Sequence, residues 1–163
     1  MTEKKTKSEK SEKSETPPED QKGGVYLLVA DNTAEFEAAL RRVAFLANRN
    51  KGHVAILYVI EDETYLHWNF IEKQIQSDKR AEAEKVLWDV AQKLYDMCEQ
   101  MPAFYIKEGK TREELMNIIS TDTTIRALVL GAAASSSNPL ISYFTGKGLS
   151  DLKVPLVIVP ESC

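Results

Sequence analysis

The sequence predicts an α/β protein with a single doubly wound, five-stranded parallel sheet and helices on both faces. Two observations predict this fold. Short apolar runs alternate with segments in which apolar residues recur at helical spacing. Such alternation favours parallel strands joined by right-handed crossovers. Four of the five runs are apolar almost throughout, as in strands covered on both faces. The five predicted strands are 25–30, 53–60, 103–108, 127–131 and 156–160, and all but 103–108 have this apolar character.

Helix signals occupy the segments between these strands. The first helix is expected to begin at a capping box formed by Asn32 and Glu35. A long second helix is expected to start near Ser77, and a third to use Thr111 as its cap. A fourth helix is predicted to start after Asn138, because asparagine is a favoured cap and the following proline suits a first helical position.

The first 23 residues differ from the rest of the chain. They contain six Lys, six Asp or Glu, and no aromatic or branched aliphatic residue. Such a segment cannot bury enough apolar surface to offset its conformational entropy. We therefore predict a disordered charged tail over 1–23 and one folded domain over 24–163. A solubilising role is favoured for the tail, with partner binding or serine phosphorylation as the alternative.

Composition argues against several classes of protein. The net charge of −4 and the isoelectric point near 5.3 disfavour a general nucleic-acid binder, which needs a basic surface. No apolar run approaches the roughly 18 residues of a membrane-spanning helix, and the charged N-terminus lacks the apolar centre of a secretory signal. Cys98 and Cys163 show no metal-ligand spacing. We expect a cytoplasmic protein without a metal site.

A ligand is expected beyond the carboxyl ends of the strands, where the chain order of a parallel sheet reverses. The candidate loops begin at Asp31, Glu61 and Gly131. The Asp31 carboxylate can accept hydrogen bonds from a ribose hydroxyl or a base amino group. Its alternative role is local, because an acid beside a helix start satisfies backbone amides. Gly131 permits a positive φ or close approach of a ligand, although a plain tight turn would also use glycine.

The loop after the fourth strand is rich in small and hydroxyl residues. Ser135, Ser136 and Ser137 precede the predicted helix, and free amides at such a position can bind an anion. A solvated loop explains the same composition equally well. The nearby Gly146-Lys147 pair is no phosphate loop, because the upstream glycine and the following Ser or Thr are missing.

Three segments, in their order and spacing, resemble the universal stress protein family. YLLVADNTAEFEAALRRVAFLA is similar to the family's first strand, aspartate and first helix, and AILYVIED to its second strand. IKEGKTREELMNII, IRALVLG and VPLVIVP are similar to the remaining strands and the helix between two of them. The resemblance covers residues 24–160. It implies strand order 3-2-1-4-5 in an adenine nucleotide alpha hydrolase-like fold, which would place Asp31 beside Gly131.

The resemblance also implies where a nucleotide would bind. ATP-binding members use the aspartate after the first strand near the base and ribose, which corresponds to Asp31, with Ala30 beside it. They use a backbone position late in the second strand at the adenine, which corresponds to Val59.

The family's phosphate motif, G-x2-G-x9-G-[S/T], is altered here. Gly131 matches its first glycine, but Ala134, Ser142 and Tyr143 stand at the later positions, and the loop is two residues shorter. Each lost glycine restricts how closely backbone amides can approach a phosphate. The nucleotide-binding candidates are Ala30, Asp31, Val59, Gly131, Ala134, Ser135, Ser142 and Tyr143.

Two functions fit these observations. The first is a dimeric binding protein that holds ATP or another adenine nucleotide in the crevice between the loops after strands 1 and 4. The second is a stress or signalling adaptor that has lost ATP and acts through dimerisation and partner contacts. Slow ATP hydrolysis is disfavoured, because 131–142 contains no metal-holding carboxylate pair and no base. No catalytic residue is predicted.

Two apolar segments are candidates for contacts. The strand 156–160 would form an unprotected sheet edge in the implied order. The family commonly pairs this edge with its copy, which predicts a homodimer through Leu156–Val159. The second segment, after strand 53–60, contains Tyr65, Trp68 and Phe70. We expect it to pack as a short helix beside the long second helix, with a lid or partner surface as the alternative.

Overall fold

The computed structural model describes residues 23–31, 33–61, 69–133 and 138–161, without the side chains of 69–76. The predicted tail therefore lies almost wholly outside the described residues, as do Ala134, Ser135, Tyr65 and Trp68. The elements are β1 (Val25–Val29), α1 (Ala34–Asn50), β2 (His53–Ile60), α2 (Asn69–Cys98), β3 (Ala103–Glu108), α3 (Thr111–Thr121), β4 (Ile125–Ala132), α4 (Pro139–Phe144), the 3-10 helix η1 (Lys147–Ser150) and β5 (Leu156–Pro160).

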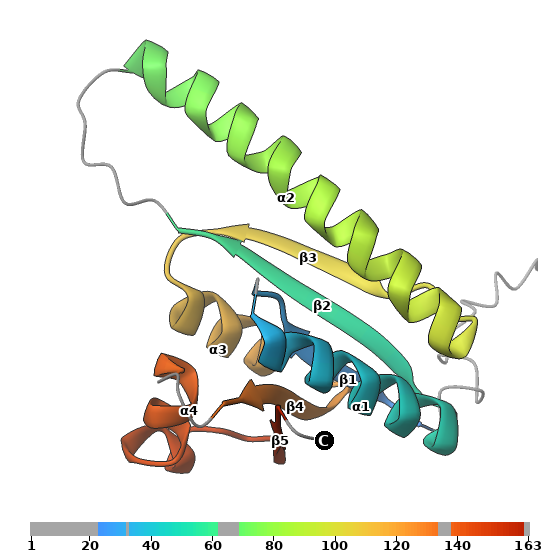
Figure 1. Ribbon diagram of the computed structural model, residues 1–163. Helices are drawn as coiled ribbons and strands as arrows, with labels where there is room; N and C mark the ends of the chain where they lie inside the picture. Colours follow the sequence, from blue (N-terminus) through green and yellow to red (C-terminus); the bar gives the residue numbers. More distant parts are fainter. Residues whose placement is uncertain (1–22, 32, 62–68, 134–137, 162–163) are drawn as a thin grey trace, which may run out of the picture.

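In the described part of the chain, five parallel strands form one sheet in the order β3-β2-β1-β4-β5. This arrangement confirms the predicted fold class and strand order. The helices lie on both sides of the sheet (Figure 1), with α1 and α2 on one face and α3 and α4 on the other. No helix among the described residues is long and apolar enough to cross a membrane.

Two hydrophobic cores hold the helices against the sheet. Leu27 and Leu28 are adjacent in β1 and almost completely buried, yet they belong to different cores because neighbouring side chains in a strand point to opposite faces. The core on the side of α1 and α2 includes Val43 and Leu94, and the other includes Leu115. This double burial explains why the central strands read as continuous apolar runs.

Two helix starts differ from prediction. Helix α1 is capped by Thr33, whose Oγ1 accepts a hydrogen bond from the Phe36 amide at 3.3 Å, so the expected Asn32 cap is wrong by one residue. Helix α2 begins at Asn69, well before Ser77. Its apolar repeat marks only the part that packs on the sheet, whereas its N-terminal part extends past the ends of β2 and β3 (Figure 1). Residues 69–75 thus belong to α2, and the expected separate short helix is wrong for them.

The edge strand β3 is tied to the α3–β4 turn by Tyr105. The Tyr105 hydroxyl donates to Asp122 Oδ2 at 2.7 Å, while Oδ1 accepts bonds from the Thr124 amide at 2.9 Å and hydroxyl at 2.5 Å. The bond to Asp122, with burial, raises the pKa of Tyr105. Burial alone would raise the pKa of Asp122, but the bonds from Thr124 and Tyr105 outweigh it and lower that pKa.

Replacing Tyr105 with phenylalanine should lower the free energy of unfolding by about 1 kcal/mol at pH 7, through the lost hydrogen bond. The folded-state pKa of Asp122 lies below its unfolded value of 3.8, so its stabilisation is present above that pH. It is lost as the pH falls through the folded pKa. The difference between wild type and Tyr105→Phe should therefore shrink from pH 7 to pH 3 in urea unfolding. A difference that stays constant would contradict a role for the ionised carboxylate.

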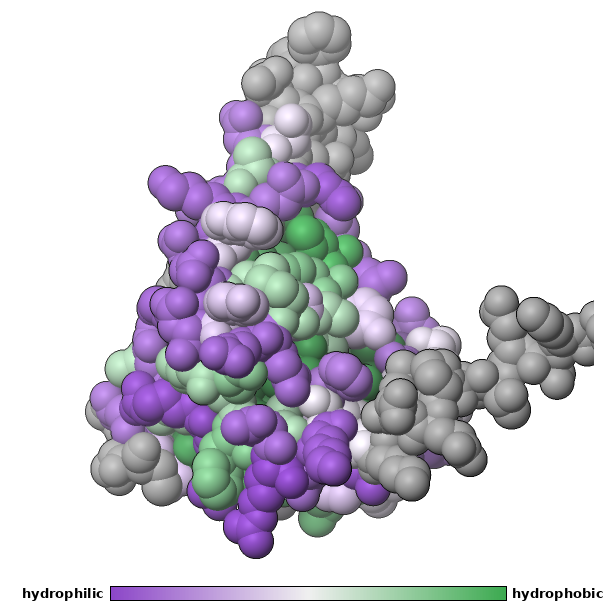
Figure 2. All heavy atoms as spheres, turned by 90° about the vertical axis from the view of Figure 1, so that its right-hand side faces the viewer, coloured by the Kyte–Doolittle hydropathy of each residue, from purple (hydrophilic) through white to green (hydrophobic). Residues whose placement is uncertain are grey.

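Large apolar side chains also lie on the surface. Trp88 and Tyr95 on α2 are 64% and 45% exposed, and Met101 before β3 is 56% exposed. They border a hollow of about 230 Å³. Figure 2, which faces the side of the molecule where α2 ends, shows apolar surface between hydrophilic margins. Trp88 is mostly exposed and contributes little to the core. Packing of the fold therefore does not explain why a tryptophan occupies this position.

Candidate functional site

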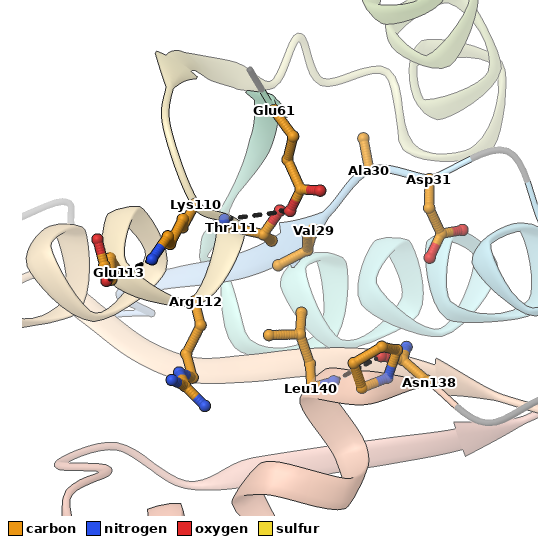
Figure 3. Close-up of a pocket in the computed structure, with 11 residues that line it drawn as sticks. Val29, Ala30, Asp31, Glu61, Lys110, Thr111, Arg112, Glu113, Asn138 and Leu140 are labelled. Carbon is orange, nitrogen blue, oxygen red and sulfur yellow. Dashed lines mark hydrogen bonds and ion pairs between the residues drawn. The ribbon is translucent and has the colours of Figure 1, made fainter. Parts of the chain in front are cut away.

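A cavity of about 410 Å³ opens beyond the carboxyl ends of β1 and β2, and the starts of α3 and α4 border it (Figure 3). This volume lies within the range of about 300–1,000 Å³ that small-molecule sites occupy. The end of β1 contributes Val29, Ala30 and Asp31, the end of β2 contributes Glu61, and the helix starts contribute residues 110–113 and 138–140. The cavity therefore lies at the sheet edge where parallel α/β proteins bind ligands.

The strand order brings Asp31 and Gly131 to the same edge of the sheet. Leu28 of β1 is paired with Val129 of the adjacent β4, Asp31 follows the end of β1 by two residues, and Gly131 lies near the end of β4. Asn138, which lines the cavity with Asp31, donates from Nδ2 to the Gly131 carbonyl at 3.4 Å. The expected juxtaposition of the two loops is thus present.

The Asp31 carboxylate has a local role and a side that faces the cavity. Its Oδ1 accepts hydrogen bonds from the Thr33 amide at 3.2 Å and the Thr33 hydroxyl at 2.5 Å, and so holds the residue that caps α1. No hydrogen bond from the described residues reaches Oδ2. Figure 3 shows the side chain directed from the end of β1 toward the start of α4. The bonds to Thr33 thus engage Oδ1 alone among the two carboxylate oxygens, as far as the described residues show.

Glu61 brings a second carboxylate to the cavity. Thr111 donates to Glu61 Oε1 from its hydroxyl at 2.6 Å and its amide at 3.4 Å. The expected cap role of Thr111 is therefore wrong. Lys110 is the N-cap residue of α3, and its side chain makes no cap hydrogen bond. The Glu61 carboxylate, which follows β2, accepts the hydrogen bond from the first amide of α3, that of Thr111. The sequence placed Glu61 at the start of a crevice loop but gave no sign of this partner.

Two cations on α3 line the same cavity. Lys110 Nζ lies 3.9 Å from the Glu113 carboxylate, which is also part of the wall. The Arg112 guanidinium lies over the ring of Tyr143, 4.3 Å from its centroid. Sequence reasoning missed both cations, because nothing in residues 110–113 indicates that they line a cavity or that Arg112 reaches across to α4.

Gly131 serves to pack α1 against the sheet. A Cβ on Gly131 would stand 2.2 Å from the Glu35 carbonyl oxygen, in the first turn of α1. Gly131 is not among the described glycines with positive φ, which are Gly24 and Gly109. Its lack of a side chain is therefore explained by close helix–strand contact.

The remaining candidates lie in different surroundings. Ala30 lines the cavity beside Asp31. The Val59 side chain packs against the core on the side of α3 and is not among the described residues that line the cavity. Ser142 is exposed on α4 and its amide donates to the Asn138 carbonyl at 3.1 Å. Tyr143 contacts the cavity wall through Arg112. Ala134 and Ser135 lie outside the described residues.

No protein-family model and no curated protein matches this sequence. Solved structures do match, and many of them are universal stress proteins that cover most of the chain. The chain thus has the universal stress protein fold, as the sequence resemblance predicted.

Three solved structures illustrate this likeness. UspA from Lactobacillus plantarum superposes with a TM-score of 0.67 at 14% identity, over 85% of this chain and 98% of its own. A universal stress protein in complex with cAMP gives a TM-score of 0.58 at 10% identity, over 85% and 97%. A universal stress protein family protein from Arabidopsis thaliana with AMP bound gives 0.55 at 10% identity, over 84% and 91%.

Proposed function

We propose that this protein binds an adenine nucleotide in the cavity bordered by the end of β1 and the starts of α3 and α4. The observation that carries the proposal is the cavity of about 410 Å³ with Asp31 in its wall, at the ligand-binding edge of this fold. Proteins of the same fold that hold AMP and cAMP support the choice of ligand class.

The wall offers contacts suited to a nucleoside. Val29 and Leu140 are half-buried apolar residues that face the cavity and can pack against the plane of a base. Asp31 and Glu61 are hydrogen-bond acceptors for ribose hydroxyls or the amino group of adenine. A mostly apolar wall with a few directed polar groups is typical of small-molecule sites.

The proposal is one of binding without turnover. The described lining includes no histidine or cysteine, and its carboxylates Asp31 and Glu61 each accept hydrogen bonds from a neighbouring threonine. Slow ATP hydrolysis is the alternative. Incubation with ATP followed by product analysis separates the two, since sustained ADP release above a buffer control would contradict pure binding.

Isothermal titration with ATP, ADP, AMP and cAMP tests the proposal directly. We expect saturable binding of at least one of them with one site per chain. Mass spectrometry of the purified protein is expected to detect any nucleotide retained from the cell. Four flat titrations, with no retained nucleotide, would contradict the proposed function.

The second candidate function is that of an adaptor that binds a partner and no nucleotide. The exposed Trp88, Tyr95 and Met101 around a hollow of about 230 Å³ favour it. It predicts flat nucleotide titrations and a requirement for Trp88 in partner capture.

We also propose that the protein forms a homodimer through β5. This strand is an edge of the sheet, and Ile158 on it is 39% exposed. Leu156 and Val157 pack against the two cores, so a charge at either would disturb folding as well as assembly. Ile158 therefore gives the cleaner test.

Replacing Ile158 with lysine should weaken the dimer at least tenfold, because an edge lysine disfavours strand pairing. Light scattering across a dilution series measures the effect. Met101→Lys is the matched control, since Met101 is exposed near the opposite sheet edge. An unchanged mass for Ile158→Lys, or dissociation caused only by Met101→Lys, would place the interface elsewhere.

A further inference from the structure

We propose that Arg112, held in place by Tyr143, binds the phosphate of the nucleotide and selects a ligand with a single phosphate. This inference rests on the proposed function, and it assigns the phosphate to α3, outside the altered motif that follows β4. It names a nucleoside monophosphate as the ligand class.

Arg112 lies where it can reach a ligand. It is the second residue of α3 and part of the cavity wall, and Figure 3 shows its side chain extending from α3 toward α4. Its guanidinium lies 4.3 Å from the centroid of the Tyr143 ring. A cation–π contact of this kind favours one orientation of a flexible side chain. The planar guanidinium can then bind two phosphate oxygens at once.

The Tyr143 ring is itself held firmly. It makes an edge contact with the fully buried Phe144, with ring centroids 5.2 Å apart. Gly148 lies close to the ring on η1, where an added Cβ would stand 2.2 Å from a ring carbon. The Tyr143 hydroxyl donates to Asp151 at 3.5 Å. The ring is therefore a fixed platform for Arg112, at the position where the resemblance expected a small hydroxyl residue.

The charges of the wall favour one phosphate over three. The described lining residues include three acids, Asp31, Glu61 and Glu113, and two bases, Lys110 and Arg112. Lys110 is already close to Glu113. A triphosphate would bring several further negative charges into a cavity whose described wall already holds more acids than bases, and like charges in close contact disfavour binding. A monophosphate can instead place its charge on Arg112 and its nucleoside toward Asp31.

Titrations with adenosine, AMP and ATP on paired variants test the assignment. Wild type should bind AMP at least tenfold more tightly than adenosine, in line with charge-assisted hydrogen bonds. Arg112→Ala should reduce AMP binding to the level of adenosine and leave adenosine binding unchanged. Lys110→Ala removes the same charge from the same wall and should change AMP affinity less than threefold. Tyr143→Leu should weaken AMP binding several-fold, whereas Tyr143→Phe keeps the ring and should not.

The outcomes separate this inference from the proposed function. Wild-type AMP affinity in Arg112→Ala, with circular dichroism showing a folded variant, would overturn the role of Arg112 and leave the nucleotide site in place. Tighter binding of ATP than of AMP to wild type would overturn the selection of a single phosphate. Absence of binding of ATP, ADP, AMP and cAMP to wild type would overturn the proposed function itself.

Discussion

Replacing Gly131 with alanine should lower the free energy of unfolding by about 3 kcal/mol, the upper part of the range for overpacking. The new Cβ would stand 2.2 Å from the Glu35 carbonyl oxygen and 2.5 Å from its carbon. These are backbone atoms in the first turn of α1, so no side-chain rotation can relieve the contact. Either β4 or the start of α1 must move. Urea unfolding measures the loss.

The same variant tests how closely the fold and the site are linked. The start of α1 is held by Thr33, which in turn bonds to Asp31. A displaced α1 should therefore shift the carboxylate and weaken AMP binding. Ala132→Gly is the matched control, because it alters the next residue of β4 without adding an atom and should cost only about 0.5–1 kcal/mol. If Gly131→Ala proves no more destabilising than this control, the close approach of the Glu35 backbone does not require a glycine at position 131.

Asp31→Ala should weaken the binding of both adenosine and AMP by about tenfold to a hundredfold, the loss expected for a hydrogen bond to an ionised group. The expected partner is a ribose hydroxyl or the base amino group, so the effect should not depend on the phosphate. This distinguishes Asp31 from Arg112, whose removal should affect AMP alone. Isothermal titration of both ligands measures the difference.

Because Asp31 also supports the cap of α1, its local role needs a control. Thr33→Ala removes the hydroxyl that accepts from the Phe36 amide and should cost about 1 kcal/mol of stability. It leaves the carboxylate in the cavity wall, so nucleotide affinity should be nearly retained. Equal loss of binding in Thr33→Ala and Asp31→Ala would mean that Asp31 acts through α1. Wild-type affinity in Asp31→Ala would remove it from the site.

The central strands β1, β2 and β4 were predictable because their middle residues are buried on both faces of the sheet. The bounds of β2, β3 and β5 agree with the runs 53–60, 103–108 and 156–160. The start of α2 was not predicted, since its first turns lie beyond the sheet and their apolar residues Phe70, Ile71 and Ile75 were read as part of the preceding aromatic segment. The strand order came from the family resemblance, and the structure confirms it.

The sequence predicted a site residue only where the position of that residue at the end of a strand was enough to place it. Asp31 follows from a general rule about strand ends, and the structure places it in a cavity. The bonds from Thr111 to Glu61 join residues 50 positions apart, and the Arg112–Tyr143 contact joins two helices. Such pairings depend on how α3 and α4 pack, which no local pattern records. The sequence analysis interpreted Gly131 as a position where a ligand could approach the backbone. In the structure, its lack of a side chain allows the first turn of α1, at Glu35, to pack against β4.

Amide chemical shifts, followed by NMR as AMP is added to the labelled protein, test the central claim most directly. The account predicts saturable shifts concentrated at Ala30, Asp31, Thr111, Arg112 and Leu140, which border one cavity. The absence of saturable shifts would contradict a nucleotide site. Shifts concentrated instead around Trp88, Tyr95 and Met101 would contradict its assigned location.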